Sequence, residues 1–147
     1  EQVANAIYRS LNVPVPASAL SDDGKQIALR WEESRGTLGE VGIDRQIADD
    51  ILDGFVADIL VMNWDAVGTG HDNVIVKASG TPLRVDQGGS LLFRAQGGLK
   101  PESALDRLDE WDSLREKNTY YAQVFKSAGV KDGDSLGNRA VSQITAF

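Results

Sequence analysis

The amino-acid sequence predicts an α+β fold with helices and antiparallel strands in separate layers. Apolar residues recur at helical spacing in some segments and form short strand-like runs in others, and turn-forming residues join these runs in pairs. A chain of 147 residues fits one domain and is long enough to bury a core. We found no internal repeat or low-complexity tract in the sequence.

The first elements are a helix and a hairpin. Apolar residues recur every four positions from Val3, which predicts a helix over residues 1–12. Residues 17–20 and 26–31 flank an Asp23-Gly24 turn signal, which predicts two antiparallel strands.

A flexible connection and a longer helix are expected next. Three glycines between residues 36 and 42 predict the connection. Apolar side chains then recur every four residues from Ile47 to Ile59 along one face. This pattern predicts one helix over residues 44–60, with Asp44 as its N-cap.

The second half of the chain predicts another hairpin followed by helices. Apolar runs at 74–76 and 83–85 are separated by a turn-forming segment that ends in Pro82. Beyond Pro101, helical spacing predicts one helix from Leu105, through Leu108 and Trp111, to Leu114. A further helix begins near Tyr120.

Composition excludes several classes of function. A net charge of −7 without a Lys/Arg cluster argues against nucleic-acid partners, and no apolar run reaches the ~20 residues that cross a bilayer, so no membrane partner is expected. The chain has no cysteine, and His71 is its only histidine. Any bound metal would therefore take oxygen ligands, which favours Mg²⁺, Mn²⁺ or Ca²⁺.

The N-terminal residues carry no targeting signal. The chain opens with Glu1 and lacks both an initiator Met and a basic stretch followed by an apolar one. We expect a piece of a longer polypeptide, and a cytoplasmic location by default.

Three polar motifs lie close together in the sequence. Asn63-Trp64-Asp65 is followed by His71-Asp72-Asn73, which leads into the first strand of the second hairpin, and Asp86-Gln87-Gly88-Gly89 follows the second strand. Asn73 and Asp86 therefore flank one hairpin at the same end. We expect their side chains to lie close enough to share an ion.

The order of elements and these polar residues resemble the HipA-type and phosphatidylinositol-kinase-like branch of the protein kinase superfamily, over residues 1–96. The fit is closest to bacterial and phage-associated kinase-like domains with Asn-Trp-Asp in place of the usual catalytic loop. The resemblance implies a kinase-like fold that is mostly C-lobe. Residues 1–35 would be a remnant of the N-lobe and hinge, and residues 43–147 the C-lobe.

The resemblance implies an ATP- and Mg²⁺-dependent phosphotransferase that acts on a hydroxyl of a protein or small molecule. Asp65 would be the catalytic base or orient that hydroxyl, and Asn73 and Asp86 would hold the metal. Glu1 matches the helix glutamate that pairs with a nucleotide-binding lysine. Gly88 would let the backbone turn beside the metal and its nucleotide.

The sequence departs from this family in several places. Asp65 and Asn73 are eight positions apart instead of five, and the insertion contains Gly68 and Gly70. Gln87 replaces the usual apolar residue after the metal-binding aspartate. The family's glycine-rich phosphate cover and strand lysine precede the helix in which this chain begins.

Alternative readings remain open. The chain could be a non-catalytic kinase-like module of a larger bacterial or phage protein, or it could transfer AMP instead of phosphate. Each motif alone is also typical of an ordinary turn. Residues 93–98 stand where kinases have their activation segment, so Arg94 could meet phosphate or substrate, or belong to an ordinary surface loop.

Overall fold

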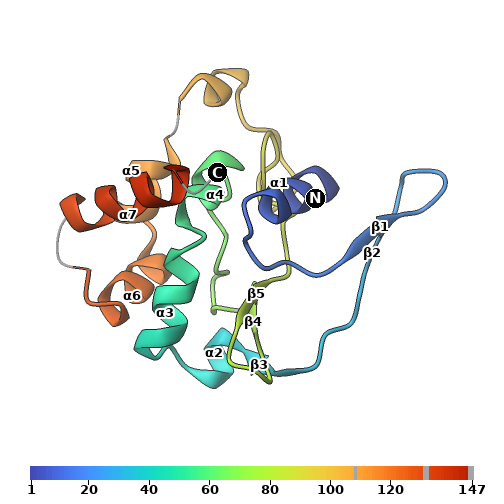
Figure 1. Ribbon diagram of the computed structural model, residues 1–147. Coiled ribbons are helices and arrows are strands. Elements are labelled where there is room, and N and C mark those ends of the chain that lie inside the picture. The colour runs from blue at the N-terminus through green and yellow to red at the C-terminus, as the bar shows by residue number, and fades with distance from the viewer. Residues whose placement is uncertain (108, 131–132, 146–147) are drawn as a thin grey trace.

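The chain folds into helices and two small antiparallel sheets, which confirms the α+β class (Figure 1). The computed structural model describes residues 1–107, 109–130 and 133–145. Its helices are α1 (Gln2–Ser10), α2 (Leu38–Val41), α3 (Arg45–Leu52), α4 (Phe55–Leu60), the 3-10 helix η1 (Glu102–Asp106), α5 (Glu110–Glu116), α6 (Thr119–Ser127) and α7 (Gly133–Thr145). Its strands are β1 (Ser18–Leu20), β2 (Ile27–Leu29), β3 (Ser34–Thr37), β4 (Val74–Lys77) and β5 (Pro82–Arg84).

Both predicted hairpins are present. Strands β1 and β2 pair in antiparallel register, with Ser18 opposite Leu29, and project from the body of the molecule as an arm (Figure 1). Strands β4 and β5 pair with Ile75 opposite Leu83. The second sheet has the order β3-β4-β5, so β3 joins the predicted hairpin at one edge.

The glycine-containing segment 36–42 is more regular than predicted. It contains the end of β3 and the short helix α2, so the expectation of a flexible connection is wrong. The Thr37 side chain accepts a hydrogen bond from the Glu40 N–H, and the Glu40 carboxylate accepts one from the Thr37 N–H. This capping box begins α2. A Cβ on Gly39 would overlap the carbonyl oxygen of Gly70, so the glycine permits a close contact here.

The helix predicted over residues 44–60 is instead two helices, α3 and α4, broken at residues 53–54. Asp44 caps the first by accepting a hydrogen bond from the Ile47 N–H at 2.8 Å, as predicted. At the break, a Cβ on Gly54 would lie 2.7 Å from the Arg84 guanidinium nitrogens. Arg84 Nη2 donates to the Ile51 carbonyl at 2.9 Å. The side chain of Arg84 thus satisfies a carbonyl at the end of α3.

The main core lies between helices α3 to α6 and strand β4. The Phe55 ring is at its centre, with ring centroids of Trp111, Tyr121 and Phe125 at 5.7, 5.6 and 5.4 Å. A smaller cluster packs α1 against α4. None of the helices in the described ranges has both the length and the apolarity needed to span a membrane.

The C-terminal helices differ in part from the prediction. The helix beginning near Tyr120 is confirmed as α6. The single helix expected from Leu105 to Leu114 is instead η1 and α5, because Arg107 has an extended backbone with φ −137° and ψ 139°. Leu108, which belongs to that predicted helix, lies outside the described residues.

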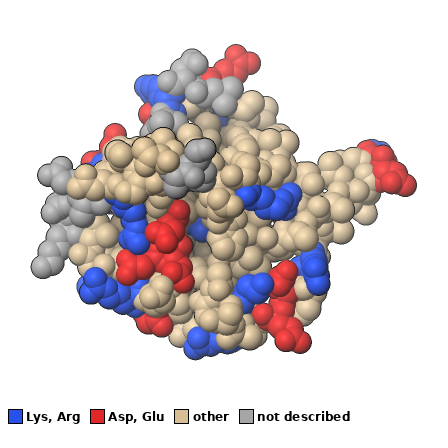
Figure 2. Space-filling view, in the orientation of Figure 1, with Lys and Arg blue, Asp and Glu red and all other residues tan. Residues whose placement is uncertain are grey.

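Ion pairs also tie helix α7 to α3. Arg139 contacts the carboxylates of Asp49 and Asp53, each at 3.1 Å. Figure 2 shows acidic and basic side chains close together on this face instead of in separate patches. These contacts between partly exposed groups contribute little to stability individually.

A buried ion pair joins elements that are far apart in the sequence. Arg84 and Asp58 are 1% and 0% exposed, and two hydrogen bonds of 2.7 Å connect their side chains. The hydroxyls of Tyr8 and Tyr121 each donate to the Asp58 carboxylate, also at 2.7 Å. These contacts connect α1, α4, β5 and α6.

The environment fixes the protonation of this cluster. Burial, followed by the Asp58 charge, raises the pKa of Tyr8 and Tyr121 well above the usual value, so both hydroxyls remain donors. Burial alone would lower the pKa of Arg84, but the Asp58 carboxylate outweighs it and the pKa is raised. The guanidinium therefore remains charged.

We expect the Arg84→Met substitution to lower the free energy of unfolding by about 3–5 kcal/mol, because the Asp58 carboxylate would remain buried without its cation. Urea denaturation measures this change.

The matched control is Arg45→Met. Arg45 is exposed and lies 3.8 Å from Asp49, so its loss should change stability by no more than about 0.5 kcal/mol. Equal losses in the two variants would show that the buried pair has no special role.

Candidate functional site

The loop that carries Asp65 is anchored at several points. After α4 the Asn63 N–H donates to the Asp58 carbonyl at 2.8 Å. The Asn118 side chain donates to the Trp64 carbonyl at 2.7 Å and also caps α6 by accepting from the Tyr121 N–H at 2.8 Å. The backbone on the N-terminal side of Asp65 is therefore fixed to two helices.

Asp65 and Asn73 are in direct contact. Asn73 Nδ2 donates to the Asp65 carbonyl at 2.8 Å and to Asp65 Oδ2 at 3.3 Å. The additional residues between them form a compact turn, in which Ala66 and Val67 are buried in the core. Gly68 permits this turn with φ +77°. This turn thus brings Asp65 into contact with Asn73, both of which are predicted site residues.

The turn after β5 places Asp86 at the same end of the hairpin as Asn73. The Val85 N–H donates to the Asn73 carbonyl at 3.0 Å, which extends the β4–β5 pairing by one residue. Asp86 Oδ1 accepts the Gly88 N–H at 2.9 Å. A Cβ on Gly89 would lie 3.1 Å from the backbone of Ala95, so this glycine allows the next loop to approach closely.

A buried amide contact connects the Asp65 loop to the Asp86 turn. Asn63 Nδ2 donates to Gln87 Oε1 at 2.9 Å, and both side chains are buried. Gln87 therefore connects the Asp86 turn to the Asp65 loop through a buried hydrogen bond.

The sequence predicted no role for four of these residues: Asp58, Asn63, Arg84 and Gln87. The available signals were a charged residue inside each of two apolar segments, Phe55–Leu60 and Leu83-Arg84-Val85.

Carboxylates gather around the predicted site. Burial raises the pKa of Asp65, the Asn73 hydrogen bond opposes that rise, and the charges of Asp72 and Asp86 add to it. Burial and then the charge of Asp86 raise the pKa of Glu1. Within the described ranges these four carboxylates have no Lys or Arg in ion-pair contact. The resulting negative potential favours a bound cation.

Asn73 and Asp86 each keep an oxygen atom of the kind that Mg²⁺ takes as a ligand. Asn73 uses its amide nitrogen to contact Asp65, so its amide oxygen is left as a potential ligand. Asp86 uses one oxygen for Gly88 and keeps the other. Among the described residues no group of three His, Asp or Glu side chains could hold a metal. A cation on Asn73 and Asp86 would therefore need phosphate or water ligands as well.

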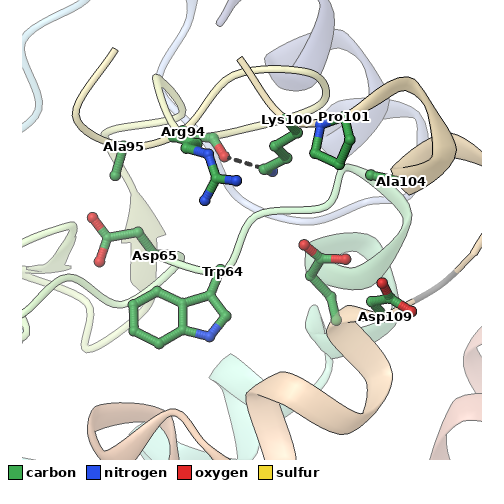
Figure 3. Close-up of a pocket in the computed structure, with 10 residues that line it drawn as sticks. Trp64, Asp65, Arg94, Ala95, Lys100, Pro101, Ala104 and Asp109 are labelled. Atoms are coloured by element: carbon green, nitrogen blue, oxygen red, sulfur yellow. Dashed lines mark hydrogen bonds between the residues drawn. The ribbon is translucent and has the colours of Figure 1, made fainter. Parts of the chain in front are cut away.

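A cavity of about 450 Å³ lies on one side of Asp65. Trp64, Arg94 and Lys100 also line it, and Figure 3 shows the Arg94 guanidinium pointing into it. Lys100 Nζ donates to the carbonyls of Met62 and Gly89, so it connects the Asp65 loop to the segment after Asp86.

A second cavity, of about 250 Å³, is mostly apolar. It lies between the end of the β1–β2 arm and the second sheet, and its lining includes Pro16, Leu29, Trp31, Ile75 and Val85. The Trp31 side chain is 86% exposed at this position.

No protein-family model, curated protein or solved structure matches this chain.

We expect Gly68→Ala to separate Asn73 from Asp65. A Cβ at residue 68 would overlap the Asp72 carboxylate and lie 2.8 Å from the backbone nitrogen of Asn73. The positive φ adds a further cost for any residue with a Cβ. The readouts are the free energy of unfolding and the NMR signal of the Asn73 side-chain amide.

Gly24→Ala is the matched control, because Gly24 has φ +68° and open space around it. It should cost about 1–2 kcal/mol through backbone strain alone. A loss at Gly68 no greater than at Gly24, with an unmoved Asn73 signal, would contradict the predicted role of the glycine.

We expect Asp65→Asn to stabilise the fold at neutral pH. The folded-state pKa of Asp65 is raised, so the native state loses stability as the pH rises from the unfolded pKa through the folded one. The variant should match the wild type at pH values below the unfolded pKa and exceed it at neutral pH. Unfolding free energies at both pH values measure this.

Asp22→Asn, at an exposed carboxylate in the β1–β2 turn, controls for the general loss of one negative charge. The prediction is wrong if the gain at neutral pH is no larger for Asp65 than for Asp22.

Proposed function

We propose that the protein is an ATP- and Mg²⁺-dependent phosphotransferase with a kinase-like fold related to the HipA-type and phosphatidylinositol-kinase-like branch. The observation that carries this proposal is the direct contact of Asp65 with Asn73, beside an Asp86 turn at the same hairpin end. Phosphoryl transfer needs a carboxylate that orients the acceptor hydroxyl, next to oxygen ligands that hold a metal ion.

The apolar cavity supports a nucleotide as the donor. Val74 and Val76 of β4 are buried in the core, so Ile75 points to the opposite face of the sheet, where it lines the cavity with Val85. Asn73 immediately precedes β4, and Asp86 immediately follows Val85, which lines the cavity. The adenine of an ATP molecule in this cavity would stack on Trp31. The phosphates of the same ATP would extend toward Asn73 and Asp86.

Each site residue then has a defined role in transfer. Asp65 orients the acceptor hydroxyl and takes its proton as the hydroxyl oxygen bonds to the γ-phosphorus. The bond from that phosphorus to the β,γ-bridging oxygen breaks, and ADP leaves. Asn73 and Asp86 would hold Mg²⁺, which when bound offsets the phosphate charge. The Asn73 side-chain amide is oriented by its hydrogen bond to Asp65, and the Asp86 carboxylate is oriented by the hydrogen bond that it accepts from the Gly88 N–H.

Two further assignments complete the proposal. Glu1 lies at the start of α1, where burial and then the charge of Asp86 raise its pKa. Its proposed partner is the nucleotide-binding lysine of a longer polypeptide. The acceptor is a hydroxyl-bearing protein or small molecule.

We expect Asp65→Asn and Asp86→Asn each to lower transfer by about 10²-fold or more, because one removes the base and the other a metal ligand. Transfer is measured with ATP labelled at the γ-phosphate, and a parallel assay labelled at the α-phosphate detects AMP transfer. Asp22→Asn should retain full activity. Full activity in either site variant would refute the assignment.

Binding of a nonhydrolysable ATP analogue with Mg²⁺ tests the nucleotide cavity separately by calorimetry. Trp31→Ala should weaken binding by about 5- to 150-fold through lost stacking. Binding that is lost in Asp86→Asn but persists in Asp65→Asn would separate metal ligation from catalysis. Binding without any transfer would instead identify a non-catalytic kinase-like module.

A further inference from the structure

The segment after the Asp86 turn forms a rigid support for Arg94. Phe93 and Leu99 form an antiparallel bridge, and the Arg94 N–H donates to the Gly98 carbonyl at 2.7 Å. The Arg94 carbonyl accepts the Gly97 N–H at 2.9 Å, so both backbone polar groups of Arg94 are engaged. These bonds hold the backbone of the loop at Arg94, whose side chain is exposed.

The Arg94 side chain presents an unused hydrogen-bonding fork to the large cavity. Its Nε donates to the Leu99 carbonyl at 3.3 Å. No carboxylate contacts its two terminal nitrogens in the described part of the chain. These nitrogens point into the cavity that Trp64 and Asp65 also line (Figure 3). A planar guanidinium in this state is suited to bind an oxyanion through two bonds.

Two cations line this cavity, Arg94 and Lys100, and Arg94 is the one whose hydrogen-bond donors are more available to an anion. Asp109 is paired with Arg107 at 2.9 Å. Burial lowers the pKa of Lys100, Glu110 opposes this effect, and the charge of Arg94 adds to it. Lys100 also donates to two carbonyls. An anion near Arg94 would relieve the repulsion between the two cations.

We propose that this cavity binds a small-molecule acceptor that carries an oxyanion, with the oxyanion on Arg94 and the reacting hydroxyl at Asp65. This acceptor role depends on the phosphotransferase function proposed above, whereas the oxyanion site itself does not. The cavity volume of about 450 Å³ falls in the range of small-molecule sites, which favours a small acceptor over an extended peptide.

Inorganic phosphate is the probe for the oxyanion site. In a titration followed by NMR, it should shift the indole N–H of Trp64 and the Nε–H of Arg94 in the wild-type protein. Arg94→Gln should weaken phosphate binding by about tenfold or more, because two charge-assisted hydrogen bonds are lost. Arg35→Gln makes the same change at an exposed position on β3 and should bind phosphate as the wild type does.

A second titration, with acetate, compares a carboxylate with a phosphate on the same residue. A shift of the Trp64 indole N–H with either probe, lost in Arg94→Gln and kept in Arg35→Gln, supports the oxyanion site. Absence of shifts in the wild type with both probes, or equal binding in Arg94→Gln, overturns it.

Repeating the phosphate titration with the bound Mg²⁺–ATP analogue separates the two proposals. Simultaneous binding supports a site for the acceptor. Competition would assign Arg94 to the nucleotide phosphates, which overturns the acceptor role and leaves the phosphotransferase standing. Phosphate binding that depends on Arg94, in a protein that binds no nucleotide, would refute the phosphotransferase and retain the oxyanion site.

Discussion

The buried ion pair between Asp58 and Arg84 is the interaction on which the rest of the structure depends. Burying two charges is costly, and here the cost is offset by bidentate geometry and by two tyrosine hydroxyls on the same carboxylate. The cluster joins α1, α4, β5 and α6, which come from distant parts of the chain. The guanidinium also occupies the space beside Gly54, where a longer helix is broken in two.

The candidate site is positioned by this interaction and its neighbours. The backbone carbonyl of Asp58 accepts the Asn63 N–H at the start of the Asp65 loop, and Arg84 precedes Asp86 by two residues. The hydrogen bond from Asn63 to Gln87 then joins loop and turn directly. Burial, and then the charges of Asp72 and Asp86, raise the pKa of Asp65, while the hydrogen bond from Asn73 opposes the rise, so the ionised carboxylate is disfavoured at this site. Such perturbed groups are common at functional sites.

Local signals in the sequence were sufficient for the two hairpins and for α1 and α6, whereas β3, α2 and α7 were not predicted and two predicted helices are each broken in two. The two hairpins and the Asp44 cap follow from turn residues and short-range hydrogen bonds. The break at Gly54 was not predicted, because helical spacing continues through it; the guanidinium of the distant Arg84 occupies the space beside this glycine. Strand β3 was missed because it contains few apolar residues and forms by pairing with β4.

The sequence by itself determined the α+β class, both hairpins and the order in which Asp65, Asn73 and Asp86 occur, because these depend on periodicity and on turns within a few residues. Only the tertiary structure decided that the loop after Asp65 returns Asn73 to Asp65, and that Gln87 connects this loop to the Asp86 turn. It also decided that Arg94 points into a cavity beside Asp65. These arrangements depend on close approaches between residues distant in sequence, which no local pattern specifies.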